Sequence, residues 1–463
     1  MFRLKDYQSR ALDALQAYLQ RARSLGAKMA FLYETDRSYH SVPQLPEVPY
    51  VCLRIPTGGG KTLMACHAVP IALHDFVRQE RGVVLWLVPT NTIKEQTLNA
   101  LRDPRHPYRQ VLDVKLGESV VIVDLPEALS LRRHVLDDET VIIVCTVAAL
   151  RVEDTEGRKV YEQSGDLISH FEGLPPALLE GLDRYENGRP IPSLANVLHL
   201  RSPIVIMDEA HHARTELSFE TLARLNPACI LEFTATPRQA PEPNPSNVLY
   251  HVSAYELKAE SMVKLPLRLE TRPDWKEALA AAAAKRAELE HYAAAEGDAT
   301  GEYLRPIVLV QAQEKSQRRE TLTVDVVRSC LLDLGVPPEQ IAIETGERRE
   351  AKKWEDEHRL TLFDISCPIR FIITIQALRE GWDCSFAYVL CSVAEMGART
   401  PVEQILGRIL RLPRATRKQN DALNHSYAYV TSHRFSRAAQ AVEGLVRGME
   451  ANGFTRFEAS TEI

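Results

Sequence analysis

The chain has 463 residues, and its 56 basic residues against 62 acidic ones leave a formal net charge of −6. At about 150 residues per domain, this length predicts two to three domains, each large enough to bury its own core. A content of 45% hydrophobic and 25% charged residues is ordinary for a globular protein and excludes a largely disordered chain. The slight excess of acid excludes a globally basic nucleic-acid coat, although local basic surface remains compatible with it.

The sequence also indicates in which cellular compartment the protein resides. No run of about 18 apolar residues occurs, so no membrane span is expected. The N-terminus, MFRLKDYQSRALDAL, is charged within its first six residues and lacks the apolar core of a secretory signal. The eight cysteines are scattered without a C-x-x-C pair, which disfavours a disulfide scaffold or a zinc ribbon. We therefore expect a cytoplasmic protein with reduced thiols.

Short β-rich apolar runs alternate with helical patterns through most of the chain, which predicts an α/β fold with parallel sheets covered by helices. In the first half these runs lie at 51–55, 83–88, 141–145, 204–207 and 229–233. In the second half they lie at 307–310, 341–343, 371–374, 388–391 and 427–430. The Pro- and Asn-rich stretch at 237–247 between them predicts an extended linker. Two lobes joined in this way would form a cleft.

We expect four parts in chain order: a first lobe, a linker with a helix, a second lobe, and a C-terminal helix or tail. Their bounds are 1–240, 241–300, 301–435 and 436–463. Residues 151–200 are polar and interrupted by Pro and Gly, which indicates an insertion in the first lobe, partly helical around 177–185. The alanine-rich segment 274–296 is made of strong helix formers and predicts a solvated packing helix.

The most informative segment is VCLRIPTGGGKTLMACHAV at 51–69, where a strand pattern runs into three glycines and then into a helix pattern. Glycines let the backbone wrap closely around phosphates, with its amides and the helix N-terminus pointing at the anion. We expect Lys61 to reach the β- and γ-phosphates and Thr62 to hold Mg²⁺. The alternative is a glycine-rich turn with a chance lysine. The complete set of expected phosphate-binding residues is Thr57, Gly58, Gly59, Gly60, Lys61 and Thr62.

This phosphate loop (Walker A) departs from the general G-x-x-x-x-G-K-T pattern, because Ile55 stands where that pattern has its first glycine. The departure favours the helicase form of the loop, T-G-x-G-K-T, over the kinase form.

The second segment is IVIMDEAHHAR at 204–214, in which an apolar strand pattern ends in two carboxylates. The carboxyl ends of strands are where α/β sheets bind ligands. We expect Asp208 to hold Mg²⁺ and Glu209 to polarise the water that attacks the γ-phosphate. A solvated acidic turn is the alternative, but it leaves the preceding strand and the phosphate loop unexplained. For His211 the alternative is a local hydrogen bond at a helix start, and we assign His212 to that interpretation.

With these two segments in place, the chain resembles a superfamily-2 helicase of the DEAH type, because further motifs follow in the order of that family. Gln8 in LKDYQSRAL resembles the adenine-reading glutamine ahead of the phosphate loop. LVPTNTIKEQT at 87–97 and VIIVCTVAAL at 141–150 resemble motifs that grip a nucleic-acid backbone. The resemblance implies such contacts for Pro89, Thr90 and Thr146.

The remaining motifs also match. Thr234-Ala235-Thr236 resembles the motif that couples hydrolysis to lobe movement, a role that the resemblance extends to His211. IVLVQAQ at 307–313 lies where the first strand of the second lobe belongs, and ITIQALREGWDCSFAYVLCSV at 373–393 resembles motif V. That motif implies nucleotide contacts for Gly381 and Asp383 and a nucleic-acid contact for Thr374. PVEQILGRILRLP at 401–413 carries Q-x-x-G-R-x-x-R, which implies catalytic roles for Gln404, Arg408 and Arg411.

The forms E-G-W-D, D-E-A-H-H and Q-I-L-G-R-I-L-R-L-P look most like the helicase portion of type III restriction enzyme R subunits. The resemblance implies two tandem RecA-like parallel-sheet lobes with an ATP cleft between them, plus short helical insertions. It implies ATP and Mg²⁺ as cofactors and DNA held mainly through its backbone. It also implies nuclease or methyltransferase (modification) subunits as partners in a bacterial system of phage defence.

The two arginines also have a physical argument. Arg408 and Arg411 lie three residues apart and share one face if 402–411 is helical, so both could point across the expected cleft. Guanidinium groups stabilise charge on the transferring phosphoryl group, an effect worth about 10³–10⁵ in rate. Residues 397–437 hold eight Lys or Arg against two acidic residues, which predicts a groove that tracks phosphates or, alternatively, a solvated basic surface.

The leading hypothesis is an ATP-dependent DNA helicase or translocase. Type III R subunits carry a further metal-dependent nuclease domain, but PDWK at 273–276 is the nearest candidate here and lies in a linker-and-helix context. We therefore expect no nuclease in this chain. An RNA helicase with the same core, or a nucleotide-gated clamp or sensor in a larger assembly, remain the alternative hypotheses.

Overall fold

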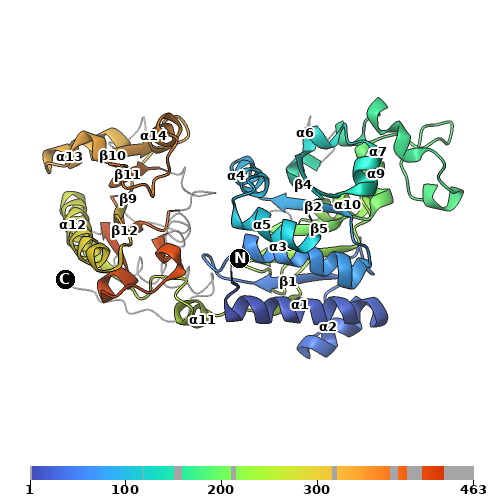
Figure 1. Cartoon of the computed structure of the whole chain (residues 1–463), viewed down its shortest axis with the longest axis horizontal. Helices are drawn as coiled ribbons and strands as arrows, with labels where there is room; N and C mark the ends of the chain where they lie inside the picture. Colours follow the sequence, from blue (N-terminus) through green and yellow to red (C-terminus); the bar gives the residue numbers. More distant parts are fainter. Residues whose placement is uncertain are drawn as a thin grey trace. The chain divides into compact units, whose positions relative to one another are not determined.

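A computed structural model describes residues 3–117, 119–150, 159–209, 215–314, 321–375, 384–393 and 409–431. The chain divides into two compact units (Figure 1). The first comprises Met1–Pro56 and Gly60–Val252, and the second comprises Ser253–Ile463 together with Thr57–Gly59.

Among the described residues of the first unit, strands form one seven-stranded parallel sheet in the order β3-β4-β2-β5-β6-β1-β7. Their bounds are Tyr50–Arg54 (β1), Val83–Val88 (β2), Val120–Asp124 (β3), Thr140–Thr146 (β4), Ile204–Asp208 (β5), Cys229–Thr234 (β6) and Val248–His251 (β7). The central strands are buried on both faces, which explains their continuous runs of Val, Ile and Leu.

Helices flank this sheet, and α3, which follows the phosphate loop, contacts both α1 and α5. The α-helices are Asp6–Leu25 (α1), Ala27–Thr35 (α2), Lys61–Ile71 (α3), Asn91–Arg102 (α4), Pro107–Leu116 (α5), Leu125–Ala128 (α6), Arg133–Asp138 (α7), Leu194–Arg201 (α9) and Glu216–Arg224 (α10). Tighter or wider helical turns occupy Ala72–Val77, Ala148–Leu150, Gly165–Phe171 and Pro176–Leu179.

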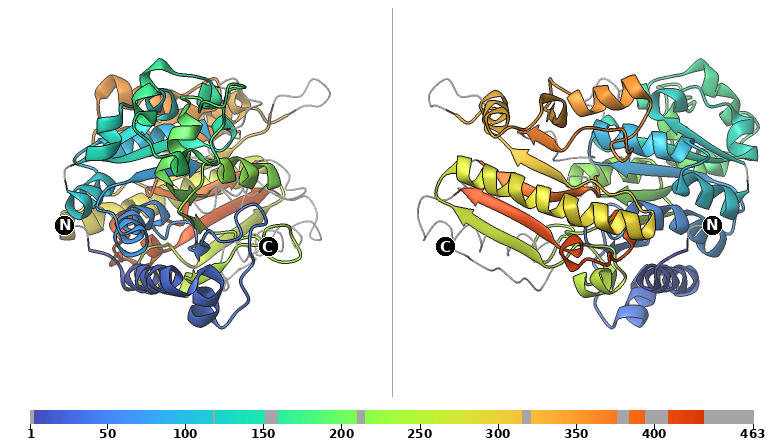
Figure 2. Two further views of the ribbon diagram at one scale, coloured as in Figure 1. Left: turned by 90° about the vertical axis from the view of Figure 1, so that its right-hand side faces the viewer. Right: turned by 60° about the vertical axis from the view of Figure 1, so that its left-hand side comes forward.

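The second unit contains a six-stranded parallel sheet in the order β10-β11-β9-β12-β13-β8. Its strands are Leu267–Arg272 (β8), Ile307–Gln311 (β9), Ile341–Glu344 (β10), Phe371–Thr374 (β11), Ala387–Ser392 (β12) and Ser426–Thr431 (β13). The α-helices are Ala254–Ala259 (α11), Trp275–Thr300 (α12), Val324–Asp333 (α13) and Glu350–His358 (α14), with short turns at Pro338–Gln340, Pro413–Ala415 and Asp421–Asn424. The long helix α12 lies along the sheet and contacts β8, β9, β12 and β13 (Figure 2).

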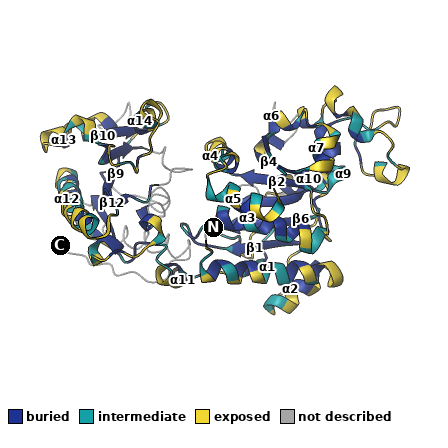
Figure 3. Cartoon of the chain, viewed as in Figure 1, coloured by how far each residue is buried: buried dark blue, intermediate teal, exposed yellow. Residues whose placement is uncertain are grey.

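All ten expected apolar runs are strands, and both sheets are the buried layers of their units (Figure 3). The predicted α/β class with two parallel sheets is therefore confirmed. The eight cysteines are buried and none forms a disulfide. Among the helices that the structure describes, none is long and apolar enough to cross a membrane.

Two expectations about the connecting segments need correction. The first sheet continues beyond residue 240, because β7 pairs with β1, and the expected linker segment 241–300 also contributes β8 to the second sheet. Both strands lie at a sheet edge and are partly exposed, so neither carries a strong apolar pattern. The expected tail, 436–463, lies outside the described residues.

The insertion expected over 151–200 is described from residue 159 onward. Its helix is not at 177–185, where only the turn Pro176–Leu179 forms and Gly181 then takes a positive φ of 81°. The helix is α9 instead, and Ser193 caps its first turn by accepting from the Asn196 amide. Leu167 and Leu194 from this segment belong to the core of the first unit, so the segment is part of the packed lobe.

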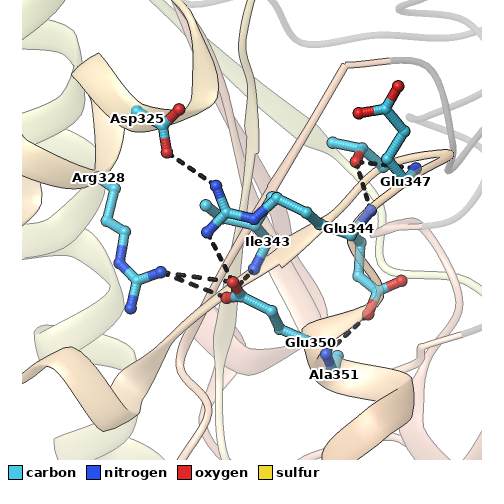
Figure 4. A network of polar contacts seen from close by, with 9 residues as sticks. Asp325, Arg328, Ile343, Glu344, Glu347, Glu350 and Ala351 are labelled. Carbon is cyan, nitrogen blue, oxygen red and sulfur yellow. Dashed lines mark hydrogen bonds and ion pairs between the residues drawn. The ribbon is translucent and has the colours of Figure 1, made fainter.

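An ion-pair network fastens α14 to β10 and α13 (Figure 4). Arg348 donates to Asp325 at 2.8 Å and to Glu350 at 2.7 Å. Glu344, the last residue of β10, accepts from the Ala351 amide at 2.7 Å. These contacts hold the loop between β10 and α14 at the carboxyl end of the sheet.

Candidate nucleotide-binding site

The phosphate loop lies between β1 and α3, as the sequence predicts. Gly60 is the N-cap of α3 with φ 78° and ψ 34°, and Gly58 has φ 88°. These are left-handed conformations that glycine adopts without a steric penalty. A Cβ atom on Gly60 would also lie only 2.6 Å from Nε2 of Gln8. Gln8, the expected adenine-reading residue, is therefore held against the phosphate loop, and its Oε1 accepts from the Lys5 amide at 3.0 Å.

Lys61 is paired with the carboxylate that follows β5. Its Nζ lies 2.8 Å from Oε1 of Glu209 and donates to the Ile55 carbonyl at 3.3 Å. The Lys61 side chain is 8% exposed and that of Glu209 is 28% exposed. The two residues therefore meet at the rim of the site, where the ammonium group lies beside the N-terminus of α3.

Asp208 and Thr62 meet deeper in the site. The Thr62 hydroxyl donates to Oδ2 of Asp208 at 2.8 Å. Burial raises the pKa of Asp208 from 3.8 to about 6, and the hydrogen bond from Thr62 opposes that shift. A hydroxyl and a carboxylate side by side are the hard oxygen donors that Mg²⁺ prefers, so these two residues fit the ion that the sequence implies.

Glu209 is held by the last residue of β6. The Thr234 hydroxyl donates to Oε2 of Glu209 at 3.2 Å and accepts from the Thr236 amide at 3.1 Å. The Glu209 backbone has φ 54°, and its amide donates to the Phe233 carbonyl at 3.0 Å. A non-glycine residue with positive φ is unusual and is often found at functional sites. The structure thus brings together the carboxylate of β5 and the threonines of the expected coupling motif.

The residues expected to contact nucleic acid lie at carboxyl ends of strands, but the hydroxyls of the three threonines among them face inward in this structure. Pro89 and Thr90 link β2 to α4, and the Thr90 hydroxyl is buried without a hydrogen-bond partner among the described residues. The Thr146 hydroxyl accepts from the Ala149 amide at 3.2 Å. Thr374 ends β11, and its hydroxyl is also buried without such a partner in the described part of the chain.

In the second unit, the structure describes Arg411 from the expected catalytic set. His211, Gly381, Asp383, Gln404 and Arg408 lie outside the described residues. Arg411 is not in the helix that the spacing predicts over 402–411, because it pairs with Val263 in an antiparallel bridge. The backbone of residues 410–412 forms hydrogen bonds with residues 262–264 of the same unit, so the helix does not extend to Arg411.

Local contacts define the roles of Lys418 and Asp274. Lys418, counted among the basic groove residues, is 3% exposed and lies 2.5 Å from Glu302, so it does not supply surface charge. Asp274, the nearest nuclease candidate, caps α12 by accepting from the Lys276 amide at 2.6 Å. Among the described residues, no group of three or more His, Cys, Asp or Glu side chains could hold a metal ion.

Lys264, which the structure places beside Arg411, is not among the site residues expected from the sequence. This lysine is fully buried, and its amide donates to the Leu410 carbonyl at 2.5 Å. A charged residue inside the apolar segment MVKLPL was the available signal.

The comparison with family models matches residues 1–239 to the type III restriction enzyme, res subunit (ResIII). No protein among the curated ones matches. Among solved structures, the chain resembles the ATP-dependent Type ISP restriction-modification enzyme LlaBIII bound to DNA, with a TM-score of 0.52 and 13% identity. That alignment covers 97% of this chain and 30% of the LlaBIII chain, so this chain spans under a third of that enzyme.

Two other solved structures are more distant in shape. S. cerevisiae Dbp5 bound to RNA and ADP BeF3 has a TM-score of 0.44 and 13% identity, over 99% of this chain and 94% of that one. A fragment of a putative HsdR subunit of a type I restriction enzyme from Vibrio vulnificus YJ016 has a TM-score of 0.40 and 13% identity, over 87% and 68%. At 13% identity, the likeness to LlaBIII shows the fold alone. The family match covers more than half of the residues, and the chain therefore belongs to the type III restriction enzyme res subunit family.

Proposed function

We propose that this chain is a DNA-stimulated ATPase that moves along DNA within a type III restriction or related bacterial defence system. The observation that carries the proposal is the pairing of Lys61 with Glu209 beside the pairing of Thr62 with Asp208. A phosphate-binding cation, a hydroxyl and two carboxylates at the ends of β1 and β5 are the set that in-line phosphoryl transfer needs.

The chemistry of each residue follows from its contacts. The phosphates of ATP compete with Glu209 for Lys61, so nucleotide binding releases the carboxylate from its cation. Glu209, still held through Oε2 by Thr234, then accepts a proton from the attacking water. Thr62 and Asp208 would hold Mg²⁺, which supplies charge neutralisation at the phosphates when it is bound. The glycines from Gly58 to Gly60 offer backbone amides to the phosphates.

The remaining expected residues complete the proposal. Gln8 would recognise adenine, and Thr234, Thr236 and His211 would transmit the state of the γ-phosphate. In the second unit, Gln404, Arg408 and Arg411 would act on the transferring phosphoryl group, while Gly381 and Asp383 would contact the nucleotide. Pro89, Thr90, Thr146 and Thr374 would contact the nucleic-acid backbone. The inward-facing hydroxyls of the three threonines imply that their backbone amides make the first contacts.

DNA is the favoured polymer because the family is one of restriction enzymes and because LlaBIII, which shares the fold, is described as bound to DNA. Nuclease or modification subunits are the partners that a restriction role implies. The exposed arginines Arg414 and Arg417 would add phosphate contacts whose strength falls with salt.

Measuring ATP turnover with duplex DNA, single-stranded DNA and duplex RNA of one sequence tests this function. We expect DNA to raise turnover by at least about tenfold and RNA to raise it far less. Equal stimulation by RNA would replace the proposal by an RNA helicase. A second assay follows ATP-driven displacement of streptavidin from biotinylated DNA. ATP-dependent retention on DNA without displacement would instead indicate a nucleotide-gated clamp.

A further inference from the structure

The buried cation Lys264 connects two segments of the second unit that carry expected motifs. Its Nζ donates to the carbonyls of Ser385 and Ala387, both at 2.8 Å, and lies 4.0 Å from the ring centroid of Tyr388. Ser385 directly follows the E-G-W-D-C sequence of the motif V segment. The ammonium group therefore fixes the backbone where this motif enters β12.

The backbone around Lys264 fixes the other motif. The Lys264 amide donates to the Leu410 carbonyl at 2.5 Å, and the Leu412 amide donates to the Met262 carbonyl at 3.0 Å. These two bonds flank the antiparallel pair of Val263 and Arg411. In such a ladder the two paired side chains project to the same side, so Val263 supports the stem of Arg411. The backbone hydrogen bonds of Leu410 and Leu412 thus fix Arg411 from both sides along the chain.

A third contact joins this ladder to the sheet. The hydroxyl of Ser426, at the start of β13, lies 3.2 Å from the carbonyls of both Lys264 and Ile409. Ser426 is fully buried, and its amide donates to the Pro266 carbonyl at 3.3 Å. The segment that leads from α11 into β8 therefore ties the residues before Arg411 to the core of the second unit.

A buried ammonium group is costly to desolvate, and an aliphatic residue of similar length would fill the same volume without that cost. The cost is offset here by two carbonyls and the aromatic face, which are the partners that a lysine uses when no water reaches it. Lys264 thereby fixes two backbone segments, one through its ammonium group and one through its amide. A catalytic arginine that must be held in one position requires such a fixed backbone.

We propose that Lys264 is the positioning residue for Arg411: it locks the start of β12 and the 410–412 segment into one rigid block. This inference rests on the proposed function, in which Arg411 acts on the transferring phosphoryl group. Lys264 itself touches no reacting atom. Its effect falls on the orientation of Arg411 and therefore on turnover, and not on the affinity for nucleotide in the ground state.

The test is a double-mutant cycle between Lys264→Met and Arg411→Ala, read out as DNA-stimulated ATP turnover. We expect Lys264→Met to lower kcat by about tenfold or more and to leave the KM for ATP within about twofold. In the Arg411→Ala background the same change should have almost no further effect, because the residue that it positions is already lost. Independent, multiplicative losses would overturn the proposal.

Arg305→Met is the matched control. Arg305 is also a fully buried cation of the second unit, and it donates to the carbonyls of Leu362, Asp364 and Cys367, a loop without an expected motif. The Arg305→Met variant should have a lower thermal unfolding midpoint but the same kcat per folded molecule as wild type. All assays are run below the unfolding midpoint of every variant. An equal loss of kcat in Arg305→Met would show a general stability effect and would contradict the proposal.

If Lys264→Met does not fold, Ser426→Ala decides the question, because it loosens the same ladder with the loss of one oxygen. We expect a smaller drop in kcat, again absent in the Arg411→Ala background. An unchanged kcat in Ser426→Ala would then overturn the proposal. Full activity of Arg411→Ala alone would instead refute the role of Arg411 in the proposed function, so the two failures are distinguishable.

Discussion

Nζ of Lys61 lies 2.8 Å from Oε1 of Glu209, so the cation expected to bind phosphate is paired with the carboxylate expected to activate water. The other oxygen of Glu209 accepts from Thr234 at 3.2 Å. A phosphate group that attracts Lys61 must therefore compete with Glu209, and this competition would link nucleotide binding to the release of the proposed catalytic base. We therefore expect substitution of Glu209 to change both ATP hydrolysis and the affinity for nucleotide.

Glu209→Gln should slow ATP hydrolysis by at least about a hundredfold, because an amide cannot accept the proton of the attacking water. Nucleotide binding should be retained and slightly tightened, because a neutral amide competes less well for Lys61. Turnover and the Kd of a fluorescent ADP analogue are the two measurements, and the protein should also remain longer on DNA in ATP. Normal hydrolysis in the variant would assign water activation to another residue.

The buried Asp208 makes stability depend on pH. Burial raises its folded-state pKa from 3.8 to about 6, so the folded protein binds more protons than the unfolded chain between these values. The contribution of Asp208 to the free energy of unfolding therefore falls as pH rises through this window and is constant above it. Asp208→Asn removes the cost of the buried charge and should stabilise the ligand-free protein by about 1–3 kcal/mol at pH 8.

At pH 5 the gain from Asp208→Asn should be smaller, because the folded wild type already carries much of its Asp208 protonated. Urea unfolding of both proteins with EDTA at the two pH values gives the comparison. A variant that is less stable than wild type at pH 8 would show that Asp208 carries no net burial cost.

Arg411→Ala should leave the Kd for ATP within about twofold and remove most of the DNA-stimulated part of hydrolysis, because the proposed role of the arginine falls on the transition state. DNA binding should persist with a salt dependence set by the remaining backbone contacts. Turnover at saturating DNA and without DNA, in both proteins, gives the fold-stimulation. Equal fold-stimulation would move the role to Arg408.

The strands and the phosphate loop could be predicted because their signals are local. The runs under β2 and β5 are continuous and β-branched, and the glycines before Lys61 precede a helix pattern, so neither needs distant contacts to be recognised. The edge strands β7 and β8 escaped prediction because they are short and half-exposed, and their pairing comes from distant partners.

The finer geometry of the site depends on contacts that no local pattern encodes. The positive φ of Glu209 is set by the bond from its amide to Phe233, on a neighbouring strand. Arg411 leaves the helical pattern because residues 262–264 pair with its backbone, and Lys264 reaches carbonyls more than a hundred residues away in sequence. Spacing along the chain contains none of these relationships.

The most direct test of the account is steady-state ATP turnover in wild type and Lys61→Ala, each with and without saturating duplex DNA. Removing the ammonium group removes the main charge that neutralises the β- and γ-phosphates, while the fold should stay intact by circular dichroism. Lys285→Ala, at a lysine of α12 paired with Glu288, is the matched control and should behave as wild type. The account predicts DNA-stimulated hydrolysis in wild type and none above background in Lys61→Ala. Near-normal turnover in a folded Lys61→Ala protein would contradict it.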